Sequence, residues 1–462
     1  MTRPHSLFDS AADAPKYLSR SDAEALTKKA LSYVTVDAAR VSVGSGSMAN
    51  SRFAVNQIST AGDSYTTQIT VRATVGKRSA TASGNRLDDE SLKALVKKAE
   101  TLARLSPEDT EAMPELGPQT YRESPGWADA TATLDPQGRA NAVAKITGPA
   151  EKAGLMSTGY LEVTSGAAAV ANSSGLFAWG RSTAACLTAT ARTTDGTGSG
   201  WAGDATNDWS TIDPSKLAAR AIEKAQRSVN PVAIEPGRYT VILEPTAVGN
   251  MVGLIAGSLA ARSADEGRSF FSKPGGGTKM GLKVVDERVN LVSDPFDPQA
   301  YGQSFTGEGL PTERVQWLQN GVVKNLAYDR YWAQKQGAKP TGAAFGTLSM
   351  SGGNSTLEEM IASTDRGLLV TRLWYIRPVD PRTILFTGLT RDGTFLIEKG
   401  KITRAVKNLR WNESPIFMLN NVEMMGKPER VSASESGSAG QALVVPPIKA
   451  RDFTFTSLSD AF

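Results

Sequence analysis

The chain has 462 residues, with 51 lysines and arginines against 47 acids, one cysteine and one histidine, His5. Histidine is the usual general base and zinc ligand near neutral pH, so its absence from the rest of the chain excludes a Ser-His-Asp triad, a Cys-His pair and an HExxH zinc site. The net charge of +4 is too small to indicate a nucleic-acid groove, and we expect no nucleic-acid partner.

The length predicts two or more domains, because single cores stop growing at roughly 250–300 residues. Residues 1–20 are polar and predict a flexible leader. They lack an apolar signal segment, and no run of about 18 apolar residues occurs in the sequence. We therefore expect a cytoplasmic protein without a membrane partner.

Four helices are predicted within residues 21–235. Ser21 and Glu24 have the capping-box spacing ahead of the first helix. Asp88, Asp135 and Asp213 are the expected caps of the other three, which run to about residues 105, 153 and 228. The expected buried stripe of the second helix consists of Leu92, Leu95, Val96, Ala99 and Leu102.

Strand patterns cover residues 39–43, 52–59, 65–75 and 159–193 of this first half. We expect Gly44, Gly46 and a turn at 61–63 to separate the first three strands. Residues 107–128 and 194–210 have loop composition, and Trp201 and Trp209 of the second loop are expected to pack onto their own domain. Cys186 lies in an apolar alternating stretch and predicts a buried thiol.

Pro231 and the Pro236-Gly237 pair suggest a domain boundary, with domains at 21–235 and 236–462. Turns at Asn320-Gly321 and Lys399-Gly400 predict antiparallel hairpins, because Asn and Gly adopt positive φ with little strain. Helices are expected at 246–262, 326–336 and 356–363, and a strand at 239–243. The predicted fold class is α+β, with an N-terminal α+β domain followed by a C-terminal domain dominated by antiparallel β-sheet.

One segment of the second half carries a recognisable motif. The sequence Glu244-Pro-Thr-Ala-Val-Gly-Asn250 follows a strand and leads into an apolar helix. It resembles the His-Glu-Ala-Val-Gly-His zinc motif of the TldD/TldE (PmbA) metallopeptidase family. Pro245, Thr246 and Asn250 stand at the positions of the first histidine, the glutamate and the second histidine, so all three chemical residues of the motif are replaced.

The resemblance continues over residues 236–450. Gly307-Glu308-Gly309-Leu310-Pro311 is similar to the Asp-Glu-Gly-Val-Pro part of a family segment. The stretch 352–361 resembles Gly-Asp-Ser-Ser-Pro-Glu-Glu-Leu-Ile, and 395–404 resembles Tyr-Leu-Ile-Glu-Asn-Gly-Lys-Ile-Thr-Arg. The shared order of these segments makes the match more specific than any one of them, and it implies a TldD/PmbA-like fold.

The resemblance implies a TldE/PmbA-like subunit that binds no metal and has no cofactor or catalytic residue of its own. In this family a zinc-bearing TldD-type chain pairs with a zinc-free TldE-type chain, and the assembly cleaves flexible peptides. A C-terminal cysteine completes the site of TldD-type chains, whereas residues 432–440 here hold serines and Glu435 but no cysteine. We therefore expect a heterodimer whose zinc lies in the partner, with flexible peptides as substrate, and no catalysis by this chain alone.

Three alternatives remain open. Glu244, Asp265 and Glu266 offer oxygen ligands for a hard cation such as Mg²⁺ or Ca²⁺. A carboxylate-based hydrolase such as a glycosidase would use a pair of acids about 5–10 Å apart. A homodimeric peptide-binding protein would need no catalysis. The acids available to the hydrolase are Glu308, Asp329, Glu358, Glu359, Asp380 and Asp392.

Overall fold

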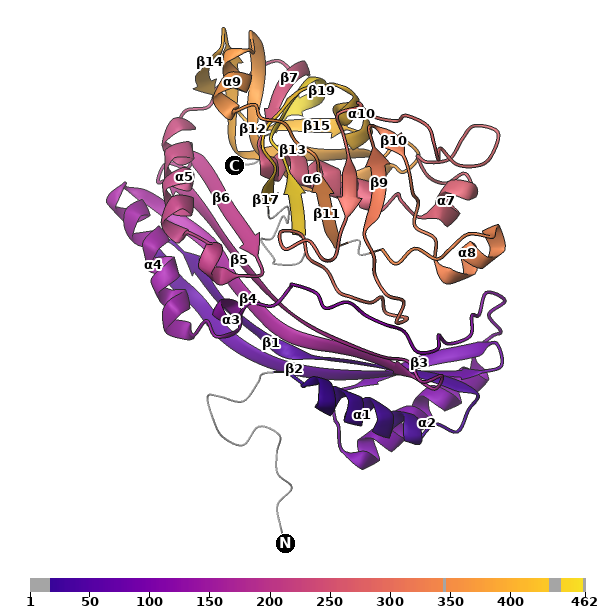
Figure 1. Cartoon of the computed structure of the whole chain (residues 1–462). Helices are drawn as coiled ribbons and strands as arrows, with labels where there is room; N and C mark the ends of the chain where they lie inside the picture. The colour runs from indigo at the N-terminus through magenta and orange to yellow at the C-terminus, as the bar shows by residue number, and fades with distance from the viewer. Residues whose placement is uncertain (1–16, 344–345, 432–441, 460–462) are drawn as a thin grey trace.

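The structure is a computed structural model that describes residues 17–343, 346–431 and 442–459. Helices and antiparallel sheets are combined in it, as Figure 1 shows, which confirms the predicted α+β class. The first half of the chain forms a long curved sheet with helices on its outer side. The second half lies against the opposite side of that sheet.

The first sheet has the strand order β3-β2-β1-β4-β5-β6, and each neighbouring pair is antiparallel. Alternate residues of its strands are buried, as expected for a sheet covered by helices. Its strands are β1 (Ala38–Ala54), β2 (Gln57–Val75), β3 (Arg78–Gly84), β4 (Leu155–Asn172), β5 (Phe177–Thr193) and β6 (Ser199–Thr206).

The expected breaks at Gly44, Gly46 and residues 61–63 were wrong, because β1 and β2 run through all three places. The chain turns instead at Val55 and Asn56, whose φ angles are 49° and 59°. Gly46 lies opposite Gly166 of β4, where a side chain on either residue would clash with the neighbouring backbone. These glycines therefore allow β1 and β4 to approach each other closely.

The helices of the first half largely follow their predicted caps. Asp88, Asp135 and Asp213 each accept a backbone N–H at the start of a helix, which confirms those three caps. The capping box at Ser21 was wrong, because Ser19 caps the first helix instead. The helices are α1 (Arg20–Ser32), α2 (Asp89–Leu105), α3 (Asp129–Ala132), α4 (Pro136–Lys152), a 3-10 turn at Trp209–Thr211 and α5 (Pro214–Arg227).

Two further expectations for this half need correction. Leu102 of α2 is 40% exposed, and Ala103 takes its place in the buried stripe. The loop predicted at 194–210 contains β6, because glycines at 198, 200 and 203 let this strand approach α5 and the ring of Trp201 closely.

The second half contains a small closed barrel. Its strands follow the order β12-β7-β19-β15-β13, and β13 pairs with β12 to close the ring, while β14 and β16 pair on the outside. The strands are β7 (Gly237–Leu243), β12 (Arg366–Asp380), β13 (Leu385–Glu398), β14 (Lys401–Ala405), β15 (Leu409–Glu413), β16 (Val422–Met425) and β19 (Ile448–Leu458).

A third sheet has the order β10-β9-β8-β11-β18-β17. Its strands are β8 (Leu291–Ser293), β9 (Val315–Gln319), β10 (Val322–Val323), β11 (Thr347–Met350), β17 (Glu429–Val431) and β18 (Ala442–Val445). Both predicted hairpins are confirmed: Asn320 and Gly321 join β9 to β10, and Lys399 and Gly400 join β13 to β14, all with positive φ.

The helices of the second half are shorter than expected. The single helix predicted at 246–262 is two helices, because α6 (Pro245–Ala256) ends at Gly257 and α7 (Ala261–Asp265) follows. The helix predicted from residue 326 begins later, since Asp329 caps α8 (Arg330–Gln336). The remaining helices are α9 (Leu357–Ala362), which agrees with its prediction to within one residue at each end, and α10 (Pro415–Asn420).

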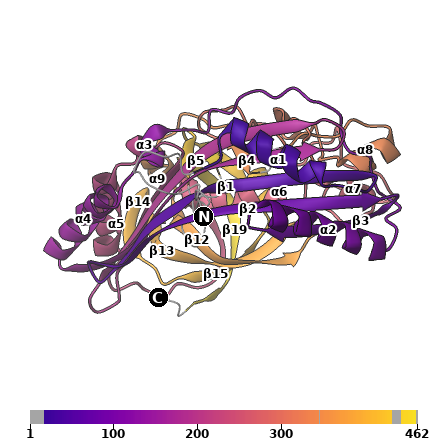
Figure 2. The same cartoon turned by 90° about the horizontal axis from the view of Figure 1, so that it is seen from below.

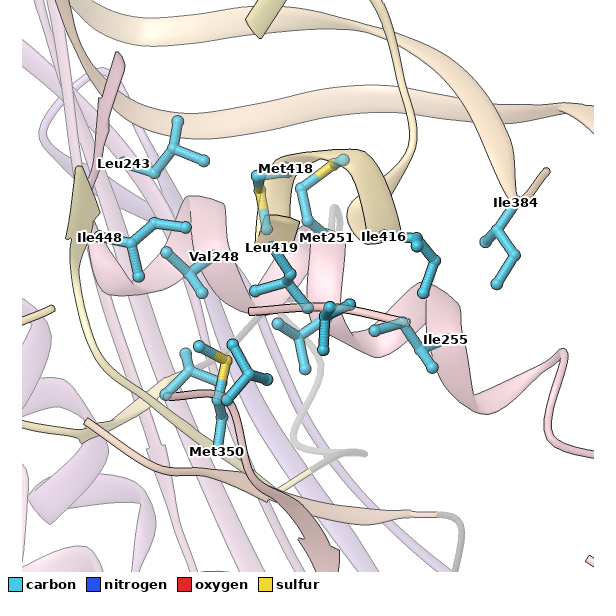
Figure 3. Close-up of a cluster of buried hydrophobic side chains, with 14 of the residues drawn as sticks. Leu243, Val248, Met251, Ile255, Met350, Ile384, Ile416, Met418, Leu419 and Ile448 are labelled. Atoms are coloured by element: carbon cyan, nitrogen blue, oxygen red, sulfur yellow. The ribbon is translucent and has the colours of Figure 1, made fainter. Parts of the chain in front are cut away.

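Helix α6 lies at the centre of the largest hydrophobic cluster (Figure 3). Val248, Met251 and Ile255 are fully buried, between Leu243 and Ile448 of the barrel and the side chains of α10. Burial of this kind is worth roughly 1.5–3 kcal/mol per large aliphatic side chain. In the described part of the chain, no helix is long and apolar enough to cross a membrane.

Candidate functional site

The altered motif occupies the start of α6. Glu244 is the N-cap of the helix, and its carbonyl accepts a 3.0 Å hydrogen bond from the Val248 N–H. Its own N–H donates to the carbonyl of Val370 in β12, also at 3.0 Å. Pro245 takes the first helical position, where its missing N–H costs nothing. Pro245 and Thr246 are half-buried, and Asn250, one turn further, is 7% exposed.

The side chain of Asn250 binds the backbone of the neighbouring strand, β12. Its Oδ1 accepts a 3.2 Å hydrogen bond from the backbone N–H of Leu373 in β12. The pairing of β12 with β13 shifts register on both sides of this point, between Val370 and Arg372 and again after Trp374. The amide of Asn250 therefore satisfies a buried backbone donor at an irregular stretch of β12.

A largely buried ion pair lies beside the start of α6, with both side chains 12–13% exposed. Lys224 of α5 donates from Nζ to Glu244 Oε2 at 2.6 Å, and the Thr371 hydroxyl lies 3.5 Å from Glu244 Oε1. Burial lowers the pKa of Lys224, against the opposing effect of Glu244. This pair joins α5 of the first half to the motif helix of the second.

A second charged cluster lies in the barrel, around Arg372 of β12 and Asp392 of β13. The Asp392 carboxylate is 3.1 Å from Arg372 Nε, accepts a 2.6 Å hydrogen bond from the Ser199 hydroxyl, and has Arg192 and Arg391 within 4 Å. The Arg372 guanidinium lies 4.7 Å from the ring centre of Trp201. Because Ser199, Arg192 and Trp201 belong to the first sheet, this Asp392 cluster also links the two halves.

Models of the PmbA/TldA metallopeptidase family match in three parts, domain 1 over residues 39–103, the central domain over 129–229 and the C-terminal domain over 236–457. Together they cover well over half of the chain. The chain belongs to the TldD/TldE (PmbA) metallopeptidase family.

Individual family members agree with this placement. The crystal structure of TldE from Thermococcus kodakarensis superposes with a TM-score of 0.82 at 22% identity, covering 94% of this chain and 99% of that one, which supports the fold. A metalloprotease of Methanothermobacter thermautotrophicus is 25% identical over 252 residues, and a zinc metalloprotease TldD homolog of Saccharolobus solfataricus is 24% identical over 226. These alignments span about half of this chain and 52% and 48% of those relatives.

The zinc ligands of the TldD/TldE family have no replacement at the three motif positions. Zinc takes three or four donors from imidazole, thiolate or carboxylate. The Pro245 side chain has no donor atom, Thr246 offers a neutral hydroxyl, and Asn250 offers a neutral carboxamide whose oxygen accepts the N–H of Leu373. These residues do not fit zinc. Residues 432–440, where TldD-type chains carry a cysteine, lie outside the described residues.

The hard-cation alternative was wrong, because its three acids do not come together. Glu244 pairs with Lys224, Asp265 accepts from the Trp332 indole at 2.6 Å, and Glu266 pairs with Arg262 and Arg268. In the described parts of the sequence, no three His, Cys, Asp or Glu side chains are grouped so as to hold a metal ion.

The six acids considered for a hydrolase likewise have separate partners. Glu308 is half-exposed between Arg40 and Arg330, Asp329 and Glu359 cap helices, and Asp392 belongs to its own cluster. Glu358 is exposed on the first turn of α9, and Asp380 accepts hydrogen bonds in a turn, where the Thr383 hydroxyl and the Arg382 N–H lower its pKa. No observation on these acids favours a glycosidase.

Sequence reasoning missed Lys224 and Arg372 while including Glu244 and Asp392. A signal for Lys224 was present, because it stands seven residues after Leu217 and three after Ala221, on the apolar stripe of α5. Nothing comparable marks Arg372. Cys186 and Trp201 are buried as expected, and Trp209 packs half-buried against the core beside α4 and α5.

Proposed function

We propose that this chain is a metal-free TldE/PmbA-like subunit of a TldD/TldE-type peptidase. It would pair with a zinc-bearing TldD-type subunit and help to enclose and position flexible peptides for cleavage, and maturation of peptides is one use of such an assembly. Its own contribution to catalysis would be indirect. The TldE and TldD names among its relatives are compatible with either role, so the proposal depends on the motif helix.

The observation that carries the proposal is the hydrogen bond between the Asn250 side chain and the backbone of β12. Zinc sites in proteins use imidazole, thiolate or carboxylate ligands, whereas Asn250 offers a neutral carboxamide whose oxygen accepts the Leu373 N–H of β12. Glu244, the carboxylate that directly precedes the helix, forms an ion pair with Lys224. Both contacts support a structural role for this helix.

Peptide cleavage tests the proposal. A fluorogenic unstructured peptide would be incubated with this chain, with a zinc-bearing TldD-type chain from the same genome, and with both together. We expect cleavage to depend on the mixture and to stop on chelation. Zinc bound at one equivalent by the isolated chain, or chelator-resistant cleavage by this chain alone, would overturn the proposal.

A variant with the family's ligand types tests why this chain would bind no zinc. The variant Pro245→His/Thr246→Glu/Asn250→His restores the ligand types of the family motif. It also removes the side-chain oxygen that accepts the Leu373 N–H. We expect the wild-type chain to bind less than a tenth of an equivalent of zinc under conditions that load the TldD-type chain fully. The variant shows whether ligand type alone limits zinc binding, since all other residues of the helix are unchanged.

A further inference from the structure

A polar cavity lies on the outer side of the first sheet. Helices α1 and α2 cover one end of this side, and α4 and α5 cover the other (Figure 2). The cavity lies between these groups, bounded by β1, β2 and β4 of the sheet and by α3 and α4. Its volume is about 280 Å³, including the part that is open to solvent. The motif helix α6 lies on the opposite side of the sheet, so a ligand in this cavity would not reach it.

The lining of this cavity departs from the apolar pattern of the sheet's outer face. Val41, Val43 and Phe53 of β1 are buried against helices on that face. Ser47 follows the same alternation and lies opposite Ser165 of β4, with the two hydroxyl oxygens 2.9 Å apart. One proton is enough for the hydrogen bond between two hydroxyls, so the second proton can be donated to another group. The cavity therefore offers a hydroxyl donor at a place where apolar side chains would be expected.

Arg139 of α4 supplies the positive charge of the cavity. Its side chain is 2% exposed, and Nη2 donates to Asp63 Oδ1 at 2.5 Å while Nη1 donates to the Leu134 carbonyl at 3.2 Å. Its Nε is also buried, and within the described part of the chain no group accepts a hydrogen bond from it. An unpaired buried donor of a charged group is costly, so the Nε–H of Arg139 requires an acceptor from outside the chain.

Asp63 of β2 supplies a matching negative charge. Its side chain is 30% exposed, and among the described residues only its Oδ1 takes part in a hydrogen bond. Oδ2 can therefore accept from a ligand. Arg139 and Asp63 are neutral together, so an added anion would be unbalanced, whereas a ligand that carries both charges would find a partner for each.

We propose that this cavity binds a small amino acid in its zwitterionic form. The ligand carboxylate accepts from Arg139 Nε and from the hydroxyl pair of Ser47 and Ser165, and the ligand ammonium group donates to Asp63 Oδ2. Drug-sized ligands occupy pockets of roughly 300–1,000 Å³, and this smaller cavity restricts the ligand to amino acids such as glycine, alanine and serine. The inference requires neither zinc nor a partner chain, so its failure and that of the proposed function are distinguishable.

Titration calorimetry of the full-length chain with L-alanine, across the millimolar range, tests the proposal. Propionate keeps the carboxylate and the methyl group but has no ammonium group, and ethylamine keeps the ammonium group but has no carboxylate. We expect one alanine to bind per chain. Both analogues should bind at least tenfold more weakly, because each loses one charge-assisted contact. L-phenylalanine should not bind, since its ring exceeds the cavity.

Variants separate the two charges of the site. Asp63→Asn keeps an acceptor for Arg139 but removes the charge that faces the ligand ammonium group. It should weaken alanine binding at least tenfold and strengthen propionate binding, because the charge of Arg139 is then unbalanced. Ala49→Leu fills the cavity and should abolish binding of both ligands. Glu151→Gln removes a charge at an exposed position of α4 and should leave alanine binding unchanged.

A single cooperative unfolding transition in each variant shows that it is folded. No alanine binding by the wild-type chain would mean that the cavity holds only water, and the proposal would fail. Propionate binding as tight as that of alanine would make it an anion site. Alanine binding that is unaffected by Asp63→Asn, or that survives Ala49→Leu, would place the amino acid elsewhere and equally overturn the proposal.

Discussion

The contribution of a single side chain of α6 to the stability of the protein can be measured. Replacing Asn250 by leucine keeps the number and branching of the side-chain heavy atoms but leaves the buried Leu373 N–H without its side-chain acceptor. We expect a loss of about 1–3 kcal/mol in the free energy of unfolding, measured by urea titration. Asn141→Leu on the exposed side of α4 is the control and should change it by less than about 0.5 kcal/mol.

Two aspartates should respond to pH with opposite signs. Burial raises the pKa of Asp204 on β6, despite nearby arginines and a lysine. Its charged form is therefore penalised in the folded state, and stability is lost as pH rises through the folded pKa. Asp204→Asn should raise the unfolding free energy at pH 7, and this gain should vanish as pH falls below the ordinary value of 3.8.

Asp195 provides the comparison for that measurement. The Thr193 hydroxyl and the Thr197 N–H hold the pKa of this exposed carboxyl below 3.8, so its contribution is present above that pH and lost in acid. Asp195→Asn should lower the unfolding free energy at neutral pH and become neutral in acid. Equal pH dependence for the two variants would contradict the assignment of burial as the cause at Asp204.

At the level of the strand, two glycines of β1 that look alike in sequence should behave differently. A Cβ on Gly46 would lie 2.5 Å from the Ser165 carbonyl oxygen, whereas one on Gly44 would meet nothing within 4 Å. Gly46→Ala should cost about 1–3 kcal/mol by thermal unfolding. Gly44→Ala should be neutral or stabilise by up to about 1 kcal/mol, because it restricts the unfolded chain.

Helix caps and hairpin turns were predictable because their signals are local. Asp88, Asp135 and Asp213 stand directly before their helices, and Asn320-Gly321 supplies the two positive φ angles that its turn requires. The long strands were not predictable in this way. A glycine such as Gly46 indicates a strand break, and only the folded structure shows that it lies opposite Gly166. The motif positions were visible in sequence, but the contact of Asn250 with β12, 123 residues away, depends on the tertiary fold.

For the whole molecule, the Asp392 cluster should determine whether the two halves unfold together. Asp392→Asn retains the shape and tolerates the φ of 54°, but it removes the charge that faces Arg372, Arg192 and Arg391. We expect a loss of about 3 kcal/mol and a separation of the calorimetric transition into two steps. Glu358→Gln, at an exposed site, should leave one unchanged transition.

The pairing of β19 with β7 has a consequence for how the protein is made. Ile448 lies opposite Leu243 in the barrel, so two strands separated by more than 200 residues must meet before the ring closes. On the ribosome, the first sheet has all six of its strands available long before β19 has emerged. The second half must wait with β7 and α6 incompletely covered, which makes it the part of the nascent chain that most needs a chaperone.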